Sequence, residues 1–337
     1  MQPIQWLMAE KSFPILFITG TRIGDAVLSS GLIKRLLDEI PHARFTIVAG
    51  PVAAPLFVDT PNLAEIIVFK KKPNDAHWFE LWWKVRGRRW GLVVDMRGSG
   101  IARLLRSRKR AIYRRRSDGA VVHKVIEAAR VLNLEDDPPP PFLYTRPETE
   151  AAAEAIVGRG GPILAIAPGA NWVGKTWPAE RFGQIATRLL APGGPMANGR
   201  LMIVGGPEDR DASYAVKLAV SRDRIVAEPG QFDLITTYAC LKRARLFIGN
   251  DSGAMHMAAS AGAPTLGLFG PSDDRLYAPW GAHARALRGP RDVETIRRAD
   301  PDFNQALCHM LDLSVDVVLA RARRLLKETE ASHGAGA

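Results

Sequence analysis

The sequence predicts an α/β protein that consists of two doubly wound, parallel-sheet domains. Short apolar runs alternate with segments of helical spacing along the chain, which is typical of parallel strands joined by helices. The length of 337 residues suits two domains of ordinary size. Residues 135–147 include four consecutive prolines, which favour a stiff, extended link. We therefore expect one domain at residues 1–146 and a second at residues 147–337.

The first half opens with an apolar strand, a glycine-rich turn and a helix of apolar periodicity. The strand is expected at residues 14–19 and the helix at residues 26–39, with Pro41 ending the helix. The same criteria predict strands at residues 45–49, 65–69, 92–95 and 111–113, and helices at residues 52–58, 78–86 and 121–132.

The second half repeats this alternation and leads to a strand, helix and strand over residues 246–271. In this unit we expect strands at residues 246–248 and 264–269, with a helix between them that ends near Gly262. Helices are also expected from residue 148 and at residues 179–190, 209–220, 232–241 and 315–327, and strands at residues 163–167, 201–204 and 224–227.

The turn at residues 249–253 is a candidate phosphate site. It leaves backbone N–H groups and the positive end of a helix just beyond the carboxyl end of a strand. Open α/β sheets bind phosphate-bearing ligands at such positions. Asp251 or Ser252 is expected to cap the helix, because either side-chain oxygen can accept an N–H of the first turn.

A second candidate phosphate site lies at residues 169–176, which also satisfy the G-x-x-x-x-G-K-[ST] pattern of phosphate-loop NTPases. In those proteins the helix begins at the Gly-Lys pair. Here Pro178 favours a helix that begins about at residue 178, which leaves Lys175 in a loop. Both interpretations give Lys175 a phosphate to bind, and they differ in the reaction that follows.

Asp25 is the third candidate, because it follows the tight turn at Gly24 and begins a helix. The helix dipole stabilises a carboxylate at this position. A capping or first-turn aspartate with no chemical role explains the same pattern, so the residues alone leave both interpretations open.

The net charge of +11 is concentrated, because residues 103–116 hold eight basic residues and no acidic one. This run indicates an anionic partner or a solvated face. Residues 78–90 combine four tryptophans with four basic residues, which suits a membrane interface or a packed helix with a basic edge. No nucleic-acid motif accompanies these residues, so nucleic acid is not an expected partner. No apolar run approaches the ~20 residues of a membrane span and the N-terminus is a poor signal peptide, so a cytoplasmic location is expected.

Three motifs in order resemble bacterial heptosyltransferases, glycosyltransferase family nine. They are Ile23-Gly24-Asp25, then P-G-A-x(n)-K-x-W-P at residues 168–178, then D-S-G-x-M-H-x-A-A from Asp251 followed by F-G-P-S-D. The resemblance spans residues 15 to about 320. It implies the GT-B architecture, with two Rossmann-like domains and a C-terminal helix that crosses back to the first domain.

The resemblance also implies roles for particular residues. Asp25 would be the catalytic base of an inverting displacement, and Lys175 would stabilise the departing diphosphate. The donor, ADP-heptose, would be bound by Gly169, Ala170, Asn171, Lys175, Asp251, Ser252, Gly253, Met255 and His256. The acceptor, an anionic lipopolysaccharide core, would be bound by Arg22, Gly24, Arg103 and Arg106. Family members often carry other residues where this chain has Gly20 and Thr21, so acceptor contacts there are left open.

Further expectations complete this interpretation. We expect no metal and no cofactor, a monomer, and peripheral contact with the inner-membrane surface on its cytoplasmic face. The alternatives are a phosphate-loop NTPase and a non-enzymatic basic protein that binds membranes or nucleic acid.

Overall fold

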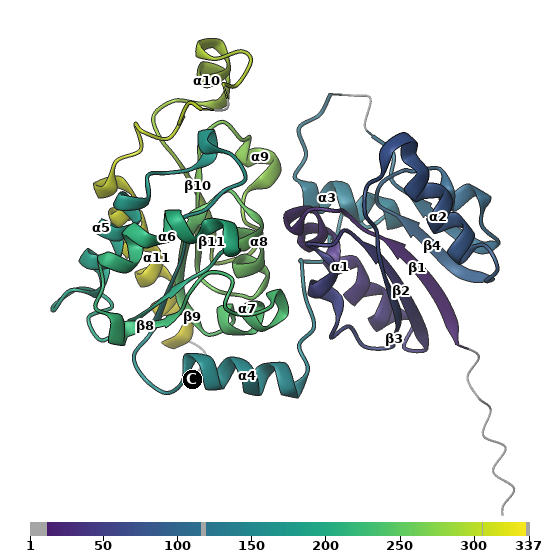
Figure 1. Ribbon diagram of the computed structural model, residues 1–337, viewed down its shortest axis with the longest axis horizontal. Helices are drawn as coiled ribbons and strands as arrows, with labels where there is room; N and C mark the ends of the chain where they lie inside the picture. The colour runs from purple at the N-terminus through teal and green to yellow at the C-terminus, as the bar shows by residue number, and fades with distance from the viewer. Residues whose placement is uncertain (1–11, 116–118, 305, 335–337) are drawn as a thin grey trace, which may run out of the picture.

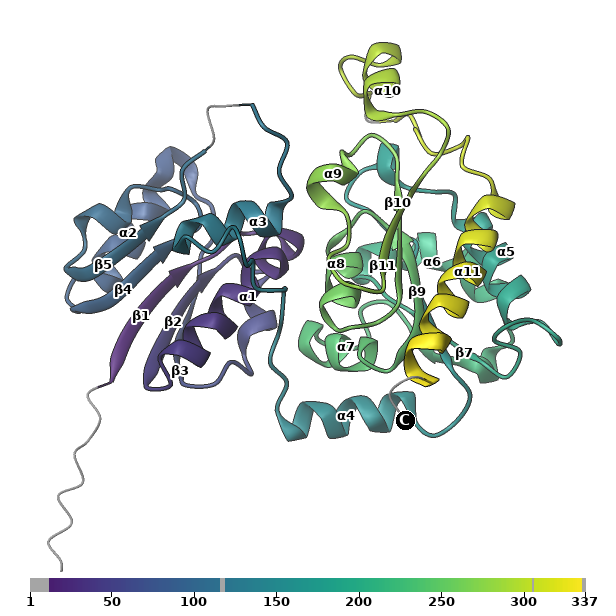
Figure 2. The same cartoon turned by 180° about the vertical axis from the view of Figure 1, so that it is seen from behind.

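The computed structural model describes residues 12–115, 119–304 and 306–334. These residues form two α/β domains, each built on a parallel sheet, that lie side by side (Figures 1 and 2). The predicted two-domain α/β fold is therefore confirmed. No helix in these ranges is long and apolar enough to cross a membrane.

The first domain contains a five-stranded sheet of order β3-β2-β1-β4-β5. Its strands are β1 (Phe13–Ile18), β2 (Ala43–Ala49), β3 (Leu63–Val68), β4 (Trp90–Asp95) and β5 (Ser107–Ile112). Helices α1 (Ile23–Glu39) and α3 (Lys124–Ala129) cover one face, and α2 (Ala76–Val85) with the short 3₁₀ helix η3 (Ile101–Leu104) covers the other. Strand side chains alternate between the faces, so Ile15 packs in the core of α1, whereas Leu16 packs in the core of α2.

The second domain contains a six-stranded sheet of order β11-β10-β9-β6-β7-β8. Its strands are β6 (Ile163–Ala167), β7 (Arg200–Ile203), β8 (Ile225–Ala227), β9 (Ala244–Asn250), β10 (Thr265–Phe269) and β11 (Ala284–Arg288). Its helices are α4 (Pro147–Val157), α5 (Ala179–Leu190), α6 (Arg210–Leu218), α7 (Leu234–Leu241), α8 (Gly253–Ser260), α9 (Asp274–Tyr277), α10 (Val293–Ala299) and α11 (Val315–Gly334).

The strand order reverses once in each sheet, between β1 and β4 in the first and between β6 and β9 in the second. Ligands of open α/β sheets bind outside the carboxyl ends of the strands at such switch points. Helices α1 and α8, which follow β1 and β9, contact each other between the domains. The two switch points therefore face each other.

Most predicted elements lie within a few residues of their expected positions, with three differences. The helix expected at residues 52–58 is only a 3₁₀ turn, η1 (Ala54–Phe57), with turns on both sides of it. Strand β11 was not predicted, since its alternation of arginine with alanine or leucine gives no apolar run. Helices α9 and α10 were also missed, because each is at most seven residues long.

The C-terminal helix α11 does not cross back to the first domain, so that prediction is wrong. Val318, Ala322 and Leu325 of α11 are buried in one core cluster with residues of β6, β9 and β10. Arg245 of β9 also donates to the Leu326 carbonyl of α11. The apolar stripe is thus fully used within the second domain, and both views show α11 on the side away from the first domain (Figures 1 and 2).

The proline-rich segment is held by both domains. The backbone N–H of Phe142 donates to Ser30 of α1, and that of Leu143 donates to the hydroxyl of Tyr238 on α7. Gly31 of α1 lies so close that a Cβ there would be 2.4 Å from the Pro140 carbonyl oxygen. Helix α4 then follows and packs on α7 of the second domain.

Candidate active site

Asp25 lies in the first turn of α1, directly after β1, and faces a cavity of about 370 Å³. The N-cap of this helix is Arg22, so Asp25 does not cap it. Within the described residues, no side-chain or backbone donor engages the Asp25 carboxylate. Burial raises the pKa of this carboxyl, while the charges of Arg22, Lys124 and Arg97 oppose that rise. The carboxylate is therefore free to accept a proton from a bound molecule.

The wall of the cavity opposite Asp25 carries a hydrogen-bonded network. The Glu127 carboxylate of α3 accepts from the Tyr113 hydroxyl at 2.5 Å and from the Lys124 ammonium. Burial alone would raise the pKa of Glu127, but these bonds outweigh burial and lower it. Arg97, which follows β4, also lines the cavity. The cavity therefore carries Arg97 as a cation that forms no ion pair within the described part of its wall, whereas Lys124 is paired with Glu127.

Tyr277 brings the second domain into this cavity. Burial raises the pKa of its hydroxyl, Lys124 opposes the rise, and the charges of Asp25 and Asp251 both add to it. Tyr277 is thus within electrostatic reach of carboxylates on both domains. Its ring also lies 5.9 Å from the Lys124 ammonium.

Lys175 lies at the end of the 3₁₀ turn η5 (Val173–Lys175) and forms an ion pair with Asp251, with 2.6 Å between Nζ and Oδ2. Helix α5 begins at Ala179 with Pro178 as its N-cap, so Lys175 precedes that helix, as predicted, and lies in the connecting segment. The pair is mostly buried, which strengthens its attraction. A phosphate entering here would find Lys175 already oriented.

Asn250 joins the two phosphate-site loops, and the sequence analysis did not single it out. Its fully buried side chain accepts from the Trp177 backbone N–H at 3.0 Å and donates to the Pro168 carbonyl at 2.7 Å. The loop that carries Lys175 is thereby tied to the end of β9. The available signal was a polar residue at the end of a buried apolar strand.

The start of α8 offers unpaired polar groups. Ser252 is its N-cap, but neither Ser252 nor Asp251 caps the helix through its side chain, so that prediction is wrong. Asp251 instead pairs with Lys175. Among the described residues, the buried Ser252 hydroxyl has no hydrogen-bond partner. Buried polar groups are normally satisfied, so this helix start is suited to an anionic ligand.

His256 lies one turn further along α8 and is 4% exposed. Burial lowers the pKa of its imidazole to about 4, so the ring is neutral at physiological pH. No atom of the described chain partners its buried Nδ1. On its other edge, Cδ2 would be 3.1 Å from a Cβ placed on Gly24 of the first domain. His256 therefore packs between the domains as well as beside the candidate phosphate site.

The starts of α1 and α8 touch because both carry glycine. A Cβ on Gly253 would lie 2.6 Å from Cγ2 of Ile23, closer than real side chains approach. Gly24 and Gly253 thus leave room for the side chains of His256 and Ile23 where the two helix starts meet.

The remaining predicted donor residues differ in placement. Gly169, Ala170 and Asn171 follow β6 in the loop that leads to Lys175. Gly169 leaves space for Asp209, whose carboxylate would otherwise clash with a Cβ at 1.9 Å. The side chain of Met255 is fully buried, faces Gly267 of β10 and belongs to the core, so the predicted donor contact of Met255 is left to its backbone.

Two predicted acceptor residues, Arg103 and Arg106, are not among the residues that line this cavity. The Arg106 carbonyl accepts from the N–H of Trp90 at the start of β4, whereas Asp25 lies beyond the end of β1. A strand of this length separates the two edges by ~20 Å.

Two other predicted acceptor residues, Arg22 and Gly24, do lie beside Asp25. The sequence analysis missed several residues that line the cavity, among them Arg97, Lys124, Tyr113 and Tyr277.

The domains are also joined above the cavity by His123, the N-cap of α3. Its Nδ1 accepts from the Val125 N–H, so its Nε2 donates, and the acceptor is the Ala278 carbonyl of the second domain at 2.9 Å. Its ring packs on Trp280 with 4.8 Å between centroids. This contact holds the segment with Tyr277 over the cavity.

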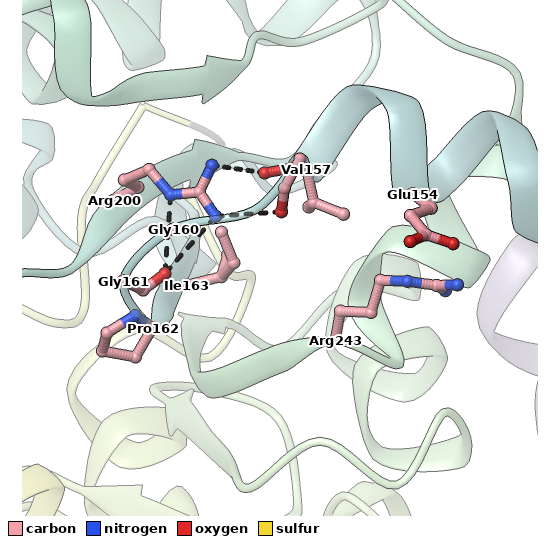
Figure 3. Close-up of a pocket in the computed structure, with 9 residues that line it drawn as sticks. Glu154, Val157, Gly160, Gly161, Pro162, Ile163, Arg200 and Arg243 are labelled. Carbon is pink, nitrogen blue, oxygen red and sulfur yellow. Dashed lines mark hydrogen bonds between the residues drawn. The ribbon is translucent and has the colours of Figure 1, made fainter.

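A further cavity lies at the amino end of β6, away from these residues, and Figure 3 shows its lining. The guanidinium of Arg200 dominates it, but its donors are used by the carbonyls of Val157, Gly158 and Gly161. Arg200 therefore holds the end of α4 in place. Its guanidinium N–H groups are already bonded to these carbonyls, so they are not available to a ligand in this cavity.

Two parallel-sheet domains whose switch points face each other are the arrangement of the GT-B fold. The chain belongs to glycosyltransferase family 9 (heptosyltransferase), whose sequence model matches residues 82–304. Lipopolysaccharide heptosyltransferase 2 of Escherichia coli K12 is 23% identical over 94% of this chain and 99% of its own length.

Two solved structures share the fold. The glycosyl transferase family 9 structure from Veillonella parvula has a TM-score of 0.76 at 23% identity and covers 94% of this chain and 98% of its own. The structure of E. coli ADP-heptose lps heptosyltransferase II has a TM-score of 0.73 at 18% identity and covers 94% of this chain and all of its own. The protein is thus a glycosyltransferase. The NTPase alternative is not supported, because α5 begins four residues after Lys175 and not at the Gly-Lys pair. The non-enzymatic alternative is not supported either.

Proposed function

We propose that this protein transfers heptose from ADP-heptose to the inner core of lipopolysaccharide, with inversion at the anomeric carbon. The observation that carries the proposal is the arrangement of the two switch points. An unpaired carboxylate, Asp25, faces the cleft from one domain, and a lysine and an open helix start face it from the other. This arrangement provides a base and a diphosphate site for one displacement.

The donor binds the second domain. Its diphosphate takes the place of the Asp251 carboxylate as partner of Lys175, or shares the ammonium with it, and receives N–H groups from the start of α8. As the bond to the sugar breaks, negative charge grows on the leaving phosphate, and Lys175 and the helix end stabilise it. Gly169, Ala170 and Asn171 form the neighbouring part of the loop. The relative named for ADP-heptose supports the identity of the donor.

The acceptor binds the cavity of the first domain, residues 1–146. Asp25 removes the proton of the attacking hydroxyl. No second carboxyl group is required to protonate the leaving oxygen, because the diphosphate departs as an anion that Lys175 and the start of α8 stabilise. Arg22, Arg97 and Lys124 surround this carboxylate and would bind anionic groups of the acceptor. The lipid anchor of such an acceptor places the enzyme at the cytoplasmic face of the inner membrane, where we propose that it acts as a monomer.

The direct test is transfer in vitro. The purified protein is incubated with ADP-heptose and a heptose-deficient core acceptor, and the product is measured by mass spectrometry. We expect a mass increase of one heptose that requires both substrates, with no product from UDP-glucose. Hydrolysis of ATP without an acceptor, together with no heptose transfer, would overturn the proposal.

A further inference from the structure

The outer layer of the first domain exposes aromatic side chains. One side of α2 is buried through Leu81 and Val85, whereas Phe79 and Trp83 on its other side are 64% and 60% exposed. Large side chains rarely remain this exposed in a group without an interaction partner. This layer covers the face of the sheet opposite α1 and the second domain (Figure 1).

The exposed rings form a contiguous group. Phe79 contacts Trp82 and Trp83, and the guanidinium of Arg86 lies 3.8 Å from the Trp83 ring centroid. The neighbouring turn η3 contacts α2 and presents Leu104, which is 70% exposed. Aromatic rings with an arginine at their edge are suited to the boundary between lipid chains and headgroups.

A basic groove adjoins these apolar groups. It has a volume of about 930 Å³, includes Leu104, and is lined by four arginines and no acidic residue: Arg89, Arg106, Arg108 and Arg110. In the described part of the chain, Arg89, Arg103, Arg106 and Arg108 form no salt bridge. Their charge is therefore available to an external anion.

We propose that α2, η3 and the adjoining groove form the surface by which this protein binds an anionic lipid bilayer. Phe79, Trp83 and Leu104 enter the interface, and the arginines meet lipid phosphates. The proposal rests on the proposed function, because a lipid-borne acceptor requires the enzyme at a membrane. It assigns Arg103 and Arg106 to the bilayer, not to the acceptor sugar.

A second copy of the chain is a poorer occupant of this surface. A two-fold contact through α2 and η3 would bring the same arginines of both copies together, and like charges at an interface repel. A bilayer with anionic headgroups offers an apolar interface to the rings and phosphates to the arginines. The cavity at Asp25 lies at the carboxyl edge of the same sheet, so it remains open when the outer layer is bound.

The test compares two double variants in vesicle sedimentation, with phosphatidylcholine vesicles that contain or lack phosphatidylglycerol. Phe79→Ser with Trp83→Ser should lower partitioning onto the anionic vesicles by about tenfold or more, because the variant lacks the two rings that the bilayer would bury. The matched control is Tyr214→Ser with Leu218→Ser on α6, whose side chains are 61% and 70% exposed on the second domain. The control should bind as the wild type does.

Charge is tested separately with Arg103→Glu and Arg106→Glu, which should abolish binding to anionic vesicles at low salt. Transfer to a water-soluble core fragment should be unchanged in all these variants, which separates this proposal from the proposed function. Equal binding by the aromatic variant and the wild type would overturn the proposal. A second outcome would also overturn it: the wild type forms a dimer in the absence of vesicles, and the aromatic substitutions abolish that dimer. The surface would then bind a second copy of the chain.

Discussion

At the scale of a single residue, the proposed base is the carboxylate of Asp25, and Asp25→Asn tests this role. The amide keeps the shape of the side chain but cannot take a proton, so kcat should fall by about 10²–10⁴. Donor affinity and Tm should be unchanged, because the proposed donor site is on the other domain and Asp25 makes no side-chain hydrogen bond that the structure describes. Asp38→Asn, on the exposed surface of the same helix, is the control.

The pH dependence of the wild-type enzyme belongs to the same residue. A base must be deprotonated to act, so kcat/KM should be lost as the pH falls through the pKa of Asp25. Because burial raises that pKa above 3.8, the acid limb should have its midpoint above this value. A kcat of Asp25→Asn close to that of the wild type would remove Asp25 as the base.

Lys175 needs a design that separates binding from stability. Lys175→Met alone leaves the buried Asp251 carboxylate unpaired and should lower Tm as well as donor affinity. Adding Asp251→Asn removes the uncompensated charge, so Tm should recover. ADP-heptose affinity should remain reduced by about tenfold or more, because a charge-assisted phosphate contact is missing. Recovery of affinity together with Tm would show that Lys175 only supports the fold.

At the scale of elements, the contact between α1 and α8 depends on Gly253. A Cβ there would meet Ile23 at 2.6 Å, so Gly253→Ala should force the helix starts apart. A displacement of ~1 Å between reacting groups can cost about 10² in rate, and we expect a loss in kcat of this order. Each domain should keep its core, so Tm should change little. The control is Gly87→Ala, since a Cβ on Gly87 meets nothing within 4 Å; equal kcat values for the two variants would contradict this role.

At the scale of the molecule, Glu150 attaches α4 to the segment that follows α7, through Lys242 and Arg243. Burial would raise the pKa of Glu150, but hydrogen bonds from Lys242, Thr145 and Arg243 outweigh it and lower the pKa to about 2. Its ionised form therefore stabilises the fold above pH 4.5, and this contribution is lost as the pH falls toward 2. Glu150→Gln should lower Tm at pH 7 and reduce the difference in Tm between pH 7 and pH 3. Glu148→Gln, on the exposed side of α4, should change neither quantity.

The sequence predicted the parts of the site that are local in the chain. Asp25 and the loop with Lys175 follow apolar strands directly, so a strand, a glycine and a polar residue were enough to find them. Arg97, Lys124 and Tyr277 could not be found this way, because only the pairing of strands and the approach of the two domains bring them to one cavity. Arg106 was predicted to bind the acceptor because of its positive charge. The register of β5 instead places it at the amino edge of the sheet, opposite the edge where Asp25 lies.

The position of α11 has a consequence for how the chain is made. All strands of the first sheet come from residues 13–112, and α11 completes the core of the second domain only. Domains generally fold as units, the N-terminal one first, as the chain leaves the ribosome. The first domain therefore does not need the last helix, and it can reach its fold while the second domain is still being translated.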